Sequence, residues 1–129
     1  PRAMVAGPAG KVWIASLPDY GMWGGTLAWY DPHTGRFGSH RNVIPDCSGQ
    51  SMTCLAEENL LLVGFAIEGG TGTQPRAERA GVVLWDPCRD ALVWQGDMGL
   101  DINAVYDLYA VGEGRAYALI LPNGKESRR

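Results

Sequence analysis

Two glycine-rich stretches hold most of the side chains that could do chemistry in this sequence. The first, residues 17–25, carries Asp19, Tyr20 and Trp23. An aromatic ring can stack on a sugar or another flat ligand, and a neighbouring carboxylate can accept hydrogen bonds from hydroxyl groups. The alternative is that Trp23 folds back and covers the end of a packed unit. The stretch therefore predicts either a ligand contact or a structural cap.

The second stretch, residues 66–80, carries Glu68, Arg76, Glu78 and Arg79 among three glycines and two threonines. An arginine side chain can pair with a carboxylate or a phosphate. The stretch lacks the Gly-Lys-Ser/Thr ending of a nucleotide-binding loop, so no nucleotide site is expected. The alternative is a solvated loop in which the glutamates neutralise the arginines. The candidate ligand-binding residues are Asp19, Tyr20, Trp23, Glu68, Arg76 and Arg79.

Three carboxylates, Asp46, Asp97 and Asp101, lie in other connecting segments. Two such groups could serve glycoside hydrolysis or bind calcium, but their spacing matches neither signature, and turn formation is the alternative. The sequence has no Ser-His-Asp arrangement and no Gly-x-Ser-x-Gly motif. Its two histidines and three cysteines, none in a C-x-x-C pair, form no metal-binding pattern. We therefore assign no catalytic residue, no metal ligand and no cofactor.

The segments that must position these loops repeat along the chain. Residues 27–32 combine an apolar run, an aromatic residue and Asp-Pro, and residues 83–87 repeat this pattern 55 positions later (87 minus 32). Asp followed by Pro is typical of a type I turn, and apolar residues resume after each turn. Strand, turn and strand make a hairpin, and a hairpin that recurs predicts a repeat architecture.

Two further short apolar runs precede each hairpin, and a third pair of runs, 104–110 and 115–121, follows the second hairpin. We therefore predict an all-β chain of four-stranded antiparallel units. Their approximate bounds are 2–41 and 51–96, with a half unit at 104–121. The tryptophans in the strands are expected to pack between units: Trp13, Trp29, Trp85 and Trp94.

The connections between strands alternate between tight turns and long links. The long links join the second strand to the third within a unit, and one unit to the next. Alternate connections of an up-and-down sheet emerge at opposite ends, so all the long links are expected on one face. In repeat folds such a face often binds the ligand.

Two segments, GKVWIAS and later LAWYDPHTGRF, resemble parts of blades of bacterial β-propellers of the kelch or quinoprotein-like kind. The resemblance covers nearly the whole chain, although the G-H…W-D signature and the kelch double glycine are incomplete. It implies a non-enzymatic binding or scaffold module that presents its long-link face to a carbohydrate or a protein partner. The alternative is a fragment of a propeller enzyme, a lyase or glycoside hydrolase, that uses loop carboxylates. Propellers share no catalytic residue, so none is carried over.

The composition fits a globular protein, with 46% hydrophobic and 19% charged residues in a chain of 129. A net charge of −3 argues against general nucleic-acid binding, which requires a basic face. No apolar run is long enough to span a bilayer, so no membrane partner is expected, and the compartment stays open.

Two and a half units cannot close a propeller, which has about four to eight blades. We therefore expect either a piece of a longer chain or assembly with further copies, and the alternative is an open β-sheet protein of another kind. The half unit should then expose apolar surface and an open strand edge near 115–121 that favours self-association. The residues expected to lack a neighbour are Val105, Leu108, Tyr117 and Leu119. The charged tail, 125–129, is expected to be frayed.

Overall fold

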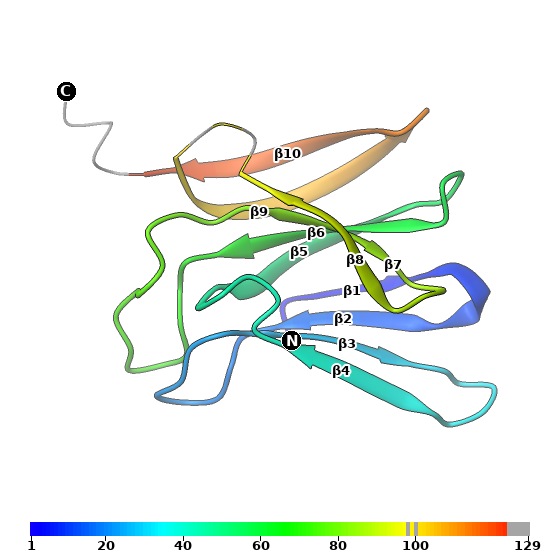
Figure 1. Ribbon diagram of the computed structural model, residues 1–129, viewed down its shortest axis with the longest axis horizontal. Helices are drawn as coiled ribbons and strands as arrows, with labels where there is room; N and C mark the ends of the chain where they lie inside the picture. The colour runs from blue at the N-terminus through cyan, green and yellow to red at the C-terminus, as the bar shows by residue number, and fades with distance from the viewer. Residues whose placement is uncertain (98, 100, 124–129) are drawn as a thin grey trace.

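The computed structural model describes residues 1–97, 99 and 101–123, and it consists of antiparallel β-strands (Figure 1). The only helical segment in this part is one 3-10 turn, η1 (Pro8–Gly10). The predicted all-β antiparallel class is therefore confirmed. The strands are β1 (Ala3–Ala6), β2 (Val12–Ser16), β3 (Thr26–Tyr30), β4 (Phe37–Arg41), β5 (Ser48–Leu55), β6 (Leu60–Ala66), β7 (Val82–Asp86), β8 (Ala91–Gly96), β9 (Ile102–Gly112) and β10 (Arg115–Pro122).

The tail at 125–129, for which fraying was expected, lies outside the described residues. Within residues 1–97, 99 and 101–123, no helix reaches the length and apolar character that crossing a membrane requires.

Strands β1 to β4 form one up-and-down sheet in chain order. Burial alternates along β2, which buries Trp13 and Ala15 on one face, as expected for a strand with one covered side. The register places Val5, Trp13 and Trp29 opposite one another across three strands. This row forms the face that the first sheet turns to the rest of the chain.

Strands β5 to β8 repeat the same order in a second sheet, and the β9–β10 hairpin joins it through a single pair, Ala66 with Ala104. Five of the seven residues of β6 are buried, and the last four of the strand are buried without interruption. A continuous buried run is typical of a strand that is covered on both faces. The second unit therefore lies between two neighbours.

The two repeated Asp-Pro turns form as the sequence predicts. Asp31 accepts a hydrogen bond from the backbone N–H of His33 at 2.9 Å, and this bond lowers the pKa of the Asp31 carboxyl. In the second copy, Asp86 accepts from the N–H groups of Cys88 and Arg89 at 2.9 and 3.2 Å. Each aspartate thus satisfies backbone donors inside the turn that joins the third strand to the fourth.

Two hydrophobic layers hold together the first unit (β1 to β4), the second unit (β5 to β8) and the β9–β10 hairpin. The first lies between the two four-stranded units, where Trp13 and Leu27 share one buried cluster with Leu61, Val63 and Trp85. The second lies between the second unit and the hairpin. Its buried members are Ala80, Val82, Ile102, Val105 and Leu108.

The second layer corrects the expectation that Val105 and Leu108 lack a neighbour. Both are buried, because the hairpin turns them toward the second unit rather than away from it. A Cβ atom on Gly64 of β6 would collide with Val105 and with the hydroxyl of Ser51. The glycine therefore permits the close approach, and the Ser51 hydroxyl donates to the carbonyl oxygen of Val105 at 2.6 Å.

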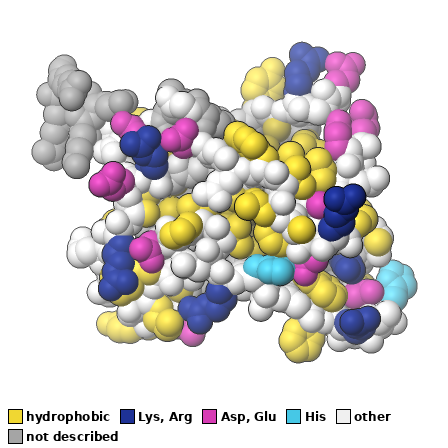
Figure 2. Space-filling model, in the orientation of Figure 1, with side chains coloured by type: hydrophobic (Ala, Val, Ile, Leu, Met, Phe, Trp, Pro, Cys, Tyr) yellow, Lys and Arg dark blue, Asp and Glu magenta, His cyan; other side chains and the backbone are white. Residues whose placement is uncertain are grey.

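Trp94 is the second correction, because it does not pack between units. Trp13 and Trp85 are buried and Trp29 is half-buried, but Trp94 is 49% exposed. Strand β9 contacts β5 and β6, whereas β8 is the outer strand beyond β7. Figure 2 shows hydrophobic side chains on the surface over this region. Leu92 of the same strand is exposed as well.

One carboxylate connects polar groups across the first layer. Asp90 follows the second Asp-Pro turn at the position of Gly35 in the first (35 plus 55), and both have positive φ, 54° and 74°. Asp90 accepts hydrogen bonds from the indole N–H groups of Trp29 and Trp85 at 3.3 and 3.4 Å. Nε2 of His40 lies 2.8 Å from its Oδ2. Asp90 therefore links residues of both units.

The variant Asp90→Gly tests this link, because glycine adopts the positive φ without strain and removes only the carboxylate. Two indole N–H groups would lose their acceptor. We expect the free energy of unfolding, measured by urea denaturation, to fall by about 1–2 kcal/mol. The control Arg89→Ala, in the same exposed turn, should change it by less than about 0.5 kcal/mol. Equal effects of the two variants would contradict the proposed role of Asp90.

Candidate functional site

The long links lie at one end of the strands and the tight turns at the other, as expected (Figure 1). Hydrogen bonds connect successive links. The N–H of Gly25 donates to the carbonyl oxygen of Cys47 at 3.0 Å, and the N–H of Asn42 donates to the carbonyl oxygen of Gly25 at 2.9 Å. The Asn42 side chain also accepts a hydrogen bond from the backbone N–H of Asp46 at 2.8 Å, and this bond closes the turn that contains Asp46. The links thus form one continuous face.

The two glycine-rich links interlock at this face. The N–H of Gly21 donates to the carbonyl oxygen of Thr71 at 2.9 Å, and the N–H of Gly70 donates to that of Met22 at 2.8 Å. A Cβ atom on Gly70 would collide with the carbonyl oxygen of Asp19, so glycine permits this backbone approach. The two links therefore support each other as one loop pair.

Trp23 joins this loop pair through both its ring and its N–H group. Its Nε1 donates to the carbonyl oxygen of Gln74 at 2.8 Å, and the guanidinium carbon of Arg76 lies 3.5 Å from the ring centroid. A cation held this close to an aromatic face is an attractive contact. One face of the Trp23 ring is thus occupied by Arg76, and the ring is half-buried. Both of these contacts come from the other link.

Tyr20 is the aromatic residue of the first link that stays accessible. Its side chain is 78% exposed, and its ring lies beside Gly72 of the second link. Asp19, the adjacent candidate, is also exposed. An accessible ring that follows an exposed aspartate in the chain is what the sequence suggested for a sugar contact.

Glu68 is neutralised by a residue that the sequence did not indicate. Its carboxylate pairs with the guanidinium of Arg2 at 3.1 Å, and the same guanidinium donates to Gln50 at 2.7 Å. The hydroxyl of Ser48 donates to the backbone carbonyl of Glu68. Glu68 therefore fastens the second link to β5 and to the residue before β1, and it pairs with neither Arg76 nor Arg79.

Arg79 brings together two of the carboxylates that the sequence suggested. Its Nη1 lies 3.2 Å from Asp97 and 3.4 Å from Asp101. The N–H of Gly99 also donates to Asp97 at 2.9 Å, and this bond, followed by that from Arg79, lowers the pKa of the Asp97 carboxyl. The two aspartates raise the pKa of Arg79. A carboxyl held in its ionised form is poorly suited to donate a proton in catalysis.

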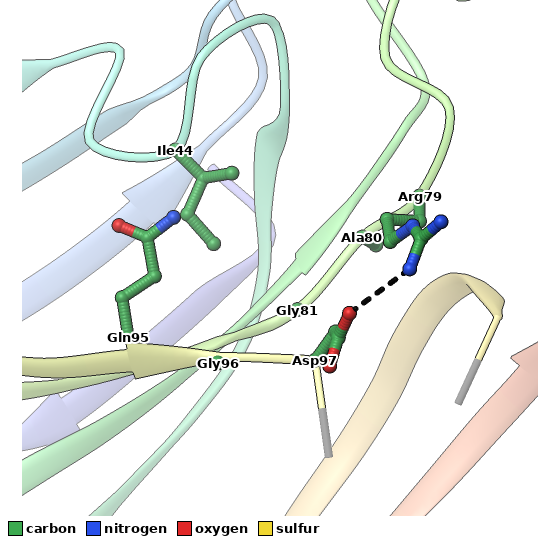
Figure 3. A pocket seen from close by; sticks show the side chains of 7 residues that line it. All are labelled: Ile44, Arg79, Ala80, Gly81, Gln95, Gly96 and Asp97. Atoms are coloured by element: carbon green, nitrogen blue, oxygen red, sulfur yellow. Dashed lines mark hydrogen bonds and ion pairs between the residues drawn. The ribbon is translucent and has the colours of Figure 1, made fainter. Parts of the chain in front are cut away.

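The Arg79–Asp97 pair lies at one side of a depression of about 440 Å³ (Figure 3). Ile44 and Gln95 point toward one another on its other side. A second depression, of about 490 Å³, is lined by both Arg76 and Arg79. The structure therefore brings these two predicted residues to one surface hollow, whereas Glu68 belongs to neither.

The buried cysteine, Cys47, offers little nucleophilic chemistry. All three cysteines are free, and burial raises the pKa of the Cys47 thiol to about 11, with a smaller contribution from the charge of Asp46. Cys47 therefore stays protonated near neutral pH. The reactive form of a cysteine is the thiolate. Within residues 1–97, 99 and 101–123, no three histidine, cysteine or acidic side chains are grouped closely enough to hold a metal ion.

No known family model matches this chain, and no curated protein or solved structure does either. Function is therefore inferred from the two loops and the strands that hold them.

The titration of Asp97 tests the electrostatic arrangement. By NMR, its carboxyl should titrate below the ordinary value of 3.8. Arg79→Met should raise this pKa but leave it below 3.8, because the Gly99 N–H is the larger cause. The lowered pKa stabilises the fold above about pH 3.8, and this contribution is lost as the pH falls through the folded-state pKa.

Arg76→Met is the matched control for this titration, because Arg76 stacks on Trp23 and is not among the groups that shift the pKa of Asp97. It should leave the titration of Asp97 unchanged. A wild-type pKa at or above 3.8, or the same small effect from both arginine variants, would contradict the arrangement.

Proposed function

We propose that the chain is a non-enzymatic binding module of β-propeller type whose long-link face binds a carbohydrate. The stacking of its units supports the propeller part of this proposal. The first strand of the second unit, β5, contacts β1 on one side and β9 on the other, so the first strands of successive units lie side by side. Propeller blades surround a central channel with this kind of radial order.

The observation that carries the binding proposal is the accessible ring of Tyr20 on a supported loop pair. Tyr20 is 78% exposed, and Asp19, the residue before it, is exposed too. Backbone hydrogen bonds from Gly21 and Gly70 fix the two links to each other. A ligand would then meet a formed surface and pay little for ordering the loops, which favours affinity. An aromatic platform with a neighbouring hydrogen-bond acceptor suits the apolar face and the hydroxyl groups of a sugar ring.

A fragment of a propeller lyase or glycoside hydrolase is the second candidate. The convergence of Asp97 and Asp101 on Arg79 favours it, because two carboxylates lie close together on the long-link face. We rank it second because Arg79 bonds to both groups, and because the lowered pKa of Asp97 suits an ion pair better than a general acid.

A glycan array followed by calorimetric titration tests the proposal. Tyr20→Ala should weaken the affinity for a bound glycan by about two- to tenfold, since an aromatic contact contributes roughly 0.5–1.5 kcal/mol. The control Tyr30→Ala removes an exposed tyrosine at the tight-turn end of β3 and should leave the affinity unchanged.

Three outcomes of this experiment would contradict the proposal. The first is a chain that binds no glycan but captures a protein through the same face. The second is equal loss of affinity in the two tyrosine variants. The third is hydrolysis or elimination of the bound glycan by the chain, which would favour the enzyme fragment instead.

A further inference from the structure

Three edge strands of the two sheets lie away from the contact between β1, β5 and β9, and two of the three are protected against pairing with another strand. Strand β4 has the sequence FGSHR, with glycine, polar and charged residues and a short length. Strand β8 carries a bulge, because Trp94 pairs with Leu84 and Leu92 pairs with Trp85, which leaves Val93 without a partner. Short polar edges and bulges are the usual protection of open strands.

The third edge strand, β10, has neither protection. All eight residues of β10 have a partner in β9. The register between the two strands shifts three times, and each shift leaves one residue of β9 unpaired: Asn103, Tyr106 and Val111. Strand β10 is therefore uninterrupted along its open side. Its interior sequence, AYALIL, contains no charge. A long apolar edge of this kind is a template for another strand.

We propose that β10 pairs in antiparallel orientation with β10 of a second copy of this chain, about a two-fold axis at Ala118. In this register Tyr117 lies opposite Leu119 of the second copy, and Leu119 lies opposite Tyr117. Both side chains are exposed, 72% and 64%, and both lie on the same face of β10 because they are two residues apart. Aromatic and aliphatic residues opposite one another stabilise antiparallel strands.

The ends of β10 are compatible with the same register. Arg115, the only charged residue of the strand, pairs with Glu113 at 2.9 Å. About the axis at Ala118, Arg115 would lie opposite Leu121 of the second copy and not opposite a like charge. The strand is thus complementary to itself, which favours a second copy over an unrelated strand. The proposal is independent of ligand binding at the long-link face.

Cysteine cross-linking tests both the pairing and its register. Across a two-fold axis at Ala118, the two Cα atoms of residue 118 would lie about 4.5–5.5 Å apart, within disulfide range. The two Cα atoms of residue 116 would lie four positions apart along the strands, about 13 Å. Ala118→Cys should therefore form a covalent dimer on mild oxidation, and Ala116→Cys should not. Both variants carry Cys88→Ser, because Cys88 is an exposed free thiol.

Sedimentation of the full chain tests the association itself. The unmodified chain should sediment as a dimer, and Leu119→Lys should weaken the dimer by about tenfold, since it replaces both cross-strand pairs. Leu92→Lys makes the same change on the bulged edge β8 and should leave the dimer intact. A monomer at high micromolar concentration would overturn the proposal. The open edge of β10 would then be expected to pair with a strand of another polypeptide. Cross-linking at residue 116 equal to that at residue 118 would also overturn it.

Discussion

The structure depends on the burial of Trp13 and Trp85 between the two four-stranded units. Trp13 is fully buried and Trp85 nearly so. Burial removes roughly 150–250 Å² per tryptophan from water, worth about 4–6 kcal/mol at 25 cal/mol per Å². The indole N–H of Trp13 has no hydrogen-bond acceptor within the described residues, which costs about 1–3 kcal/mol. Burial therefore outweighs the polar cost, and the two sheets are held face to face.

This packing determines where the long links meet. Because the sheets are stacked with their strands in the same order, the links of successive units emerge beside each other and can exchange hydrogen bonds. Arg76 reaches Trp23 across this junction, and Arg79 reaches Asp97 within the second unit's own links. The arrangement of the candidate site is thus a consequence of the packing between units, since each loop donates a backbone hydrogen bond to the other.

The repeat in the sequence predicts much of the fold, because strand, turn and buried face are local properties. The strand Thr26–Tyr30 and the two Asp-Pro turns follow directly from residue type and spacing. The contacts of the site could not be predicted in this way. Arg76 with Trp23, and Arg2 with Glu68, join residues from different units, and nothing in a single sequence indicates which of several charges will meet.

The two corrections have the same physical origin. Period-two alternation states which residues share a face, but it does not state which face a neighbouring unit covers. Val105 is buried because the hairpin packs on the second unit, and Trp94 is exposed because β8 lies beyond that contact. Which face of a sheet is covered depends on how the units pack against each other, so the sequence of one strand cannot predict it.

Native-state hydrogen exchange measures most directly whether packing between the units holds the fold together. If burial of Trp13 and Trp85 couples the two sheets, the slowest amides of β2 and β6 should exchange through one common opening. Their opening free energies should then agree and fall with the same slope as denaturant increases. Exchange of the β2 amides through a separate opening of much lower free energy, with β6 still protected, would contradict this coupling.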